Sequence, residues 1–149
     1  MAIAIFLHLL GVTIWVGGMF FAYMALRPAA ASTLEPSSRL PLWSATFARF
    51  FVWVWLAIAL IFGSGLYMIM QIGVARVPDF IWTMAAIGVL MLLIYAHVYF
   101  APYRRLRRHS ALLAWQDAGK ALAQIRVLVA INLTLGILNI AVATIGESL

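Results

Sequence analysis

Four long runs of apolar residues, separated by stretches that hold nearly all of the charges, constrain how this chain can fold. The runs cover about residues 2–26, 47–71, 80–103 and 125–145. Each is long enough to cross a bilayer, which takes roughly 20 apolar residues. Because lipid offers the backbone no hydrogen-bond partners, such segments fold as helices. We therefore predict an all-α, integral membrane four-helix bundle, with residues 1–149 forming a single transmembrane domain.

Composition supports a membrane protein, since 66% of the residues are hydrophobic and 9% are charged. A soluble domain is nearer half apolar and a quarter charged. The first run has no basic residue before it and is longer than the apolar core of a signal peptide, so we expect a retained helix. The chain has no cysteine, which excludes disulfides and thiolate metal sites and leaves His, Met and carboxylates as ligands.

The basic residues predict the orientation of the helices. They gather in and beside residues 27–46 and 104–124, whereas the connection at 72–79 holds one Arg and one Asp. Basic connections stay in the cytoplasm, so both termini are expected on the outer side of the membrane. This placement explains the net charge of +6 better than nucleic-acid binding does.

The two basic connections are expected to differ in structure. Residues 27–46 are rich in Ala, Ser and Pro and are predicted to be a mobile loop. Residues 110–124 are predicted to form a short surface helix with Ser110 as N-cap. Its lipid-facing residues would be Leu112, Leu113, Trp115 and Leu122.

The first run carries a histidine on a face with two glycines. His8, Gly11, Trp15 and Gly18 follow at steps of three and four residues, which places them on one side of a helix. An ionisable group inside a membrane is by default a functional candidate. The empty surface at each glycine would let another helix or a porphyrin approach the backbone. The alternative is a neutral imidazole bonded to a carbonyl or hydroxyl.

The rise per residue of an α-helix gives the depth of each candidate ligand in the membrane. His8 and Met84 lie about 10 Å and 8 Å below the outer surface, where Met68 and Met70 end the second run. His97 lies about 10 Å from the inner end of its helix, so the two histidines differ in depth by roughly 16–18 Å. One metal held by both is therefore awkward.

Polar residues in the inner half and on the fourth run have structural alternatives. Arg49 and Arg126 open the second and fourth runs, where arginines either reach the headgroups or anchor an anionic group such as a haem propionate or a quinone oxygen. Asn132, Gly136 and Asn139 share one face, which is typical of hydrogen-bonded, closely packed membrane helices.

Four stretches occur in order along the chain: HLLGVTIWVGGMFF, ARFFVWVWLAIALIFGSGLYMIM, YAHVYFAPYRRLRR and IRVLVAINLTLGILN. In this order they resemble the CopD family, bacterial inner-membrane proteins named for copper resistance, in its short stand-alone form. The resemblance implies a multi-pass protein of the bacterial inner (plasma) membrane with periplasmic termini.

That family is in turn similar to the HemJ proteins, four-helix membrane proteins that bind b-type haem and oxidise protoporphyrinogen. This similarity implies that His8 is a haem ligand and that Met84 is its partner. A lysine soon after that methionine is typical of those proteins, and Ala85, Ala86 and Ile87 stand there instead. This departure counts against the oxidase activity, and whether the chain is an enzyme is left open.

The sequence leaves three functions open. The first is haem b binding for electron transfer with a quinone or a redox partner protein, with His8 and either Met84 or His97 as axial ligands and Arg49 and Arg126 on the propionates. The second is copper handling at a soft outer-leaflet site made by His8 with Met68, Met70 and Met84. The third is a cofactor-free helical subunit of a larger complex. Small-residue faces would also allow a homodimer.

Overall fold

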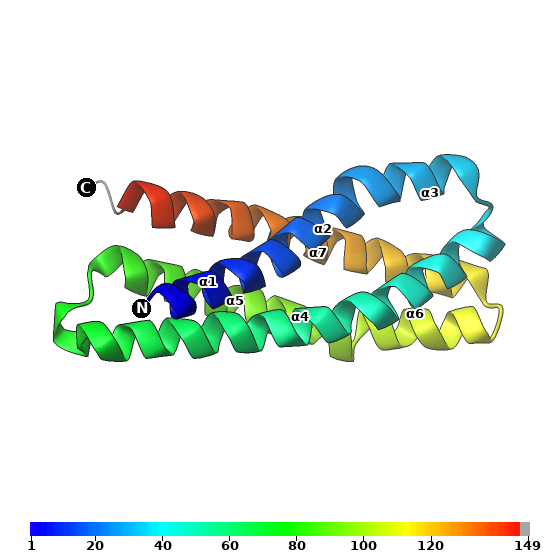
Figure 1. The fold of residues 1–149 in the computed structure, drawn as a ribbon. Helices are drawn as coiled ribbons and strands as arrows, with labels where there is room; N and C mark the ends of the chain where they lie inside the picture. The colour runs from blue at the N-terminus through cyan, green and yellow to red at the C-terminus, as the bar shows by residue number, and fades with distance from the viewer. Residues whose placement is uncertain (147–149) are drawn as a thin grey trace.

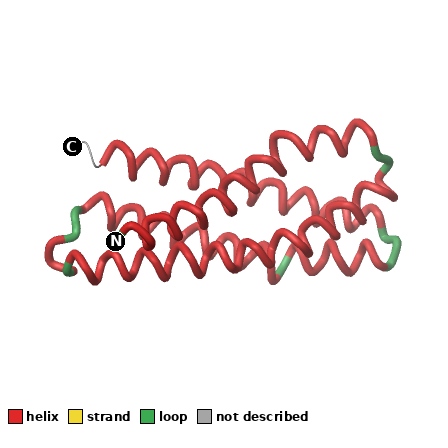
Figure 2. The backbone as a smooth tube through the Cα atoms, in the orientation of Figure 1, coloured by secondary structure: helices red, strands yellow, loops and turns green. Residues whose placement is uncertain are grey.

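The computed structural model describes residues 1–146 and is helical throughout, with no strand in this part of the chain (Figures 1 and 2). The first segment is one continuous rod of α1 (Ala2–Val12), η1 (Thr13–Gly17), α2 (Gly18–Phe21), η2 (Ala22–Leu26) and α3 (Arg27–Thr33). Then follow α4 (Pro36–Ile72), the short turn η3 (Val74–Arg76), α5 (Asp79–Phe100), α6 (Pro102–Ala111) and α7 (Trp115–Gly146).

The four predicted membrane helices are confirmed as segments long and apolar enough to span a bilayer. They are Ala2–Thr33, Pro36–Ile72, Asp79–Ala111 and Trp115–Gly146. All four are longer than the apolar runs themselves. The 37 residues of α4 extend about 55 Å, against about 30 Å for the hydrocarbon core. Each rod therefore continues beyond the hydrocarbon, where charged side chains are tolerated.

The expectation of a mobile loop at residues 27–46 is wrong. α3 continues the first rod to Thr33, and α4 begins at Pro36, so only Leu34 and Glu35 lie outside helices. Pro36 occupies the first turn of α4, where the missing N–H is not needed, whereas Pro28 and Pro41 lie inside continuous helical segments. None of these three prolines ends a helix.

The predicted surface helix over residues 110–124 is also wrong. Ser110 is buried near the end of α6 and caps nothing, and α7 begins at Trp115 as one long helix. Leu112 and Leu113 form the turn between the two helices and are exposed. Trp115 and Leu122 are half-buried and line a cavity inside the bundle. Pro102 interrupts the helix after Ala101, and the chain reverses at residues 112–114, where Leu113 has a positive φ of 56°, so that α7 packs along α6.

The helices pack as an antiparallel bundle. α1 lies along α4, α5 lies along α7, and α6 contacts α7 and α4. The N-terminus and the end of α7 lie at the same end as the α4–α5 connection, which we call the terminal end (Figure 1). The α3–α4 and α6–α7 connections lie at the opposite end, which we call the basic end. Which end faces the cytoplasm stays a prediction.

Aromatic rings fill the core between the helices. Phe51 stacks on Phe47 with ring centroids 5.2 Å apart, and Tyr95 meets Phe51 and Trp15 edge to face. The Tyr95 hydroxyl donates a hydrogen bond to the carbonyl of Phe51, which satisfies its polar end inside the core. Outward-facing residues such as Ile3, Val52 and Leu93 are apolar and more than 60% exposed, as a lipid-facing surface requires.

Candidate functional site

His8 is held between α1 and α4 by one ring nitrogen. Its Nδ1 lies 3.1 Å from the carbonyl oxygen of Ile61 and 3.1 Å from the hydroxyl of Ser64. Both partners lie on α4, more than 50 residues away in the chain. The imidazole is half-buried, and Nε2 has no hydrogen-bond partner among residues 1–146. The histidine is thus anchored by one nitrogen only.

The hydrogen bonds of Ser64 determine which nitrogen of His8 carries the proton. Ser64 donates its only hydroxyl hydrogen to a carbonyl of its own helix, at Leu60 or Ile61. The Ser64 oxygen can then only accept from His8, and the Ile61 carbonyl has no hydrogen to give. Nδ1 must therefore be the donor. A neutral imidazole in this position keeps its lone pair on Nε2, the form that binds a metal.

The predicted face of α1 packs against another helix. A Cβ built on Gly11 would lie 2.8 Å from the carbonyl oxygen of Ala57 and 2.7 Å from the side chain of Ile61. A Cβ on Gly18 would overlap the ring of Phe50. The glycines would let either a helix or a porphyrin approach the backbone of α1. In the structure the helix α4 occupies that space.

Met68 is the sulfur closest in register to His8. It lies one helical turn after Ser64 on the same face of α4 and is half-buried. α1 runs antiparallel to α4, so Met68 lies on the terminal side of His8. Met84 lies near the same depth, because Gly88, one turn further along α5, faces Phe62 of α4. However, α5 packs along α7, and the Met84 carbonyl accepts a hydrogen bond from Asn139.

The other predicted residues lie away from His8. His97 is exposed, about 20 Å further along α5 than Met84. Arg49 is exposed and donates to the Ala45 carbonyl of its own helix. Arg126 lines a cavity that also includes Phe47, which lies about 21 Å from Ile61 along α4.

These distances show whether the residues predicted to hold a haem lie around one site. Arg126 borders a cavity that lies about 21 Å along α4 from Ile61, the partner of His8, so the structure does not bring these two predicted residues together. His8 lines neither the cavity beside Arg126 nor a smaller one bordered by Trp15, Phe51 and Tyr95. The residues predicted to hold a single haem are therefore not assembled around one site.

The described residues also contain no cluster of three or more His, Asp or Glu side chains that could hold a metal ion. A closed tetrahedral site such as structural zinc needs four ligands. The His8 site offers one imidazole nitrogen and a thioether one turn away from its anchor. That donor set suits a soft ion of low coordination number better than a hard divalent cation.

Two features of the structure were missed by the sequence reasoning. Ser64 was not recognised as a partner of His8, although a lone hydroxyl between Gly63 and Gly65 in an apolar run is a detectable signal. The cavity beside Arg126 also contains Arg27 and Arg39. Arg39 could not be placed there while residues 27–46 were expected to form a loop.

Comparison with known families matches residues 44–145 to the family described as copper resistance protein D, CopD. The matched region runs from α4 to α7 and includes Ser64, Met68 and Met84, whereas His8 precedes it. Searches for similar curated proteins and solved structures give no match. The family match covers more than half of the chain. The chain is therefore a member of the CopD family, a multi-pass membrane protein related to copper resistance.

Proposed function

We propose that this protein handles copper in the membrane by binding Cu(I) reversibly at His8, with copper as its cargo. The observation that carries the proposal is the anchoring of Nδ1 by Ile61 and Ser64, which keeps the Nε2 lone pair available within a membrane-spanning helix. Membership of a copper-resistance family supplies the choice of metal.

We assign Met68 as the second ligand. Thioether sulfur is a soft ligand that selects Cu(I), and imidazole binds copper well. Met68 lies one turn from Ser64 on the face of α4 that holds His8. Met84 matches in depth, but it lies on a helix that packs along α7, so we keep it as a ligand for a later step of transfer.

The test is an anaerobic Cu(I) titration of the detergent-purified full chain against a chromophoric Cu(I) chelator. Loss of an outer-shell partner alone costs about 10–100-fold in metal affinity, so His8→Ala is expected to cost at least about 100-fold. Met68→Leu keeps the volume of the side chain and should also weaken binding.

Matched controls exist for both substitutions. His97→Ala removes an exposed histidine, and Met70→Leu removes a methionine that is 69% exposed on the same helix. Both controls should bind Cu(I) as the unmodified protein does. Equal affinity of the His8→Ala variant and the unmodified protein would exclude His8 as the ligand and overturn the proposal.

Haem b binding with electron transfer stays a prediction from the sequence, and the same preparation tests it. A reduced-minus-oxidised optical spectrum with Soret and α bands that disappear in His8→Ala would establish a haem on His8. Such a spectrum would also show that α1 and α4 separate to admit the ring, since Gly11 is closed by Ala57 and Ile61.

A further inference from the structure

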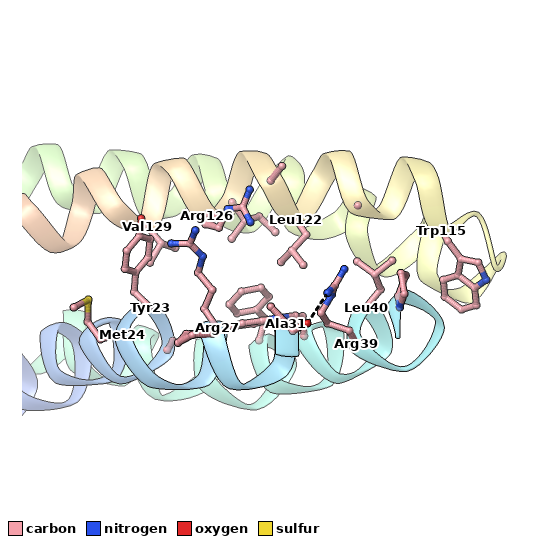
Figure 3. A pocket seen from close by; sticks show the side chains of 18 of the residues that line it. Tyr23, Met24, Arg27, Ala31, Arg39, Leu40, Trp115, Leu122, Arg126 and Val129 are labelled. Carbon is pink, nitrogen blue, oxygen red and sulfur yellow. Dashed lines mark hydrogen bonds between the residues drawn. The ribbon is translucent and has the colours of Figure 1, made fainter. Parts of the chain in front are cut away.

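A large cavity opens at the basic end of the bundle, well away from His8. Its volume is about 720 Å³, and it lies between the end of the first rod, the start of α4 and the first half of α7 (Figure 3). Arg27 and Arg39 extend across it toward α7, the helix that carries Arg126 (Figure 3). Three guanidinium groups from three segments therefore border one space.

These three arginines have no counter-charge. None of the residues that line the cavity is acidic. Arg27 lies over the ring of Tyr23 at 4.7 Å, and Arg39 donates to the Ala31 carbonyl at 3.5 Å. Within residues 1–146 the only ion pair joins Lys120 and Asp117 on the exposed surface. Because like charges repel, three guanidinium groups around one cavity favour an anion between them.

Apart from Gln116, the remainder of the wall is apolar and aromatic. Trp43 and Phe47 come from α4, and Trp115, Leu122 and Val129 come from α7. The space is much larger than one phosphate or carboxylate group requires. A ligand that fits both parts of this wall carries an anionic head and an apolar body.

The depth of the arginines indicates where that ligand comes from. Arg27 follows an uncharged stretch of 25 residues from Ala2, and Arg126 precedes another that extends to Gly146. Both arginines therefore lie where the hydrocarbon gives way to the headgroups, which is the level of the lipid phosphates. Basic pockets between membrane helices are known binding places for anionic headgroups. The lining also contains no histidine to ligate a haem iron.

We propose that this cavity is a binding site for an anionic phospholipid. The phosphate group lies among Arg27, Arg39 and Arg126, and the acyl chains lie against Trp43, Phe47 and Val129. Arginine suits this role because its planar donors bind phosphate oxygens in pairs. The lipid would join the end of the first rod to α7 through one shared anion. This site is independent of copper binding at His8.

The test is lipid binding to the delipidated full chain, measured by native mass spectrometry in neutral detergent. The probes are dioleoyl phosphatidylglycerol, which is anionic, and dioleoyl phosphatidylcholine, which is zwitterionic with the same chains. Phosphatidylglycerol should bind more tightly. A hydrogen bond to a charged group is worth about tenfold or more in affinity, so Arg27→Gln, Arg39→Gln and Arg126→Gln should each weaken it by at least about tenfold.

Arg49→Gln is the matched control, because Arg49 is exposed near the same end of the bundle and does not line the cavity. It should leave phosphatidylglycerol binding unchanged. Gly119→Leu provides a second variant without a change of charge. A Cβ at Gly119 meets nothing within 4 Å, so the added side chain should occupy the cavity without disturbing the fold. It should weaken the binding of the lipid.

Three results would overturn the proposal. Equal binding of the two lipids would show that charge does not select the ligand. Equal losses from Arg49→Gln and the cavity variants would show attraction by the whole basic surface. Displacement of phosphatidylglycerol by inorganic phosphate at similar concentration would assign the site to a soluble phosphate. Loss of binding only in the cavity variants would establish the lipid site.

Discussion

At the scale of the residue, the state of one imidazole depends on the hydroxyl of Ser64. Ser64 uses its hydrogen on its own helix, so its oxygen can only accept from His8. The carbonyl oxygen of Ile61 likewise can only accept a hydrogen bond from His8. An orienting partner of this kind fixes the tautomer of a metal-binding histidine and strengthens the ligand.

Ser64→Ala is therefore expected to weaken Cu(I) binding without abolishing it. The Ile61 carbonyl still holds the proton on Nδ1, so the loss should be near the lower end of the range for outer-shell partners, about tenfold. Thr13→Ala is the control, because the exposed Thr13 hydroxyl bonds only to Leu9 of its own helix. The Cu(I) titration measures both. A Ser64→Ala variant with unchanged affinity would contradict the orienting role.

The sequence allows His8 to be recognised as unusual, because it is the only histidine, and the only acidic or basic side chain apart from the phenol of Tyr23, in the first apolar run. The kind of partner, a carbonyl or a hydroxyl, could be expected, but which residues supply it could not, since that depends on the register between α1 and α4. A shift of one helical turn would replace Ser64 by Leu60 or Met68 opposite the imidazole. The register is determined by close contacts such as that of Gly11, which no local pattern reveals.

At the scale of the element, the close contact between α1 and α4 holds the His8 site together. Gly11→Ala would place a methyl group 2.8 Å from the Ala57 carbonyl oxygen, and a backbone atom cannot move aside alone. Overpacking of this kind costs about 1–3 kcal/mol. We therefore expect Gly11→Ala to lower the midpoint of thermal unfolding in detergent.

Gly63→Ala is the matched control for this prediction. A Cβ at Gly63 meets nothing within 4 Å, so only the gain in helix propensity remains. Its unfolding midpoint should be equal to or higher than that of the unmodified protein. Equal midpoints for the Gly11→Ala and Gly63→Ala variants would show that α1 and α4 are not in close contact.

The existence of the four membrane helices was predictable from the sequence, but their lengths were not. The apolar runs identify the four spans, because lipid permits no other backbone arrangement. The helical extensions lie outside the hydrocarbon, where composition no longer distinguishes helix from loop. Pro28, Pro36 and Pro41 look like breaks in the sequence, but Pro36 stands in the first turn of α4 and the other two lie inside continuous helical segments. On α7, Gly136 lies against Val16 and Met91 and Asn139 donates to the Met84 carbonyl, as the sequence indicates, whereas the Oδ1 of Asn132 has no hydrogen-bond partner among residues 1–146.

At the scale of the whole molecule, the described chain places its two functional candidates at opposite ends. His8 lies toward the terminal end and the arginine cavity at the basic end. The distribution of Arg and Lys predicts that the basic end faces the cytoplasm. In that orientation copper at His8 would be close to the outer surface, and the lipid would belong to the inner leaflet.

Cysteine labelling in intact cells tests this orientation, because the chain has no cysteine of its own. Ser37→Cys and Leu112→Cys place exposed thiols at the basic end, and Val74→Cys places one at the terminal end. A membrane-impermeant maleimide added to spheroplasts should label only Val74→Cys. The other two should react only after the membrane is opened. The reverse pattern would invert the topology.

We propose above all that His8 binds copper through Nε2. X-ray absorption at the copper K-edge of the Cu(I)-loaded full chain tests it most directly, because the scattering identifies the ligand atoms. We predict one imidazole nitrogen and one sulfur, with loss of the imidazole signal in His8→Ala and of the sulfur in Met68→Leu. An imidazole signal that persists unchanged in His8→Ala would contradict the claim.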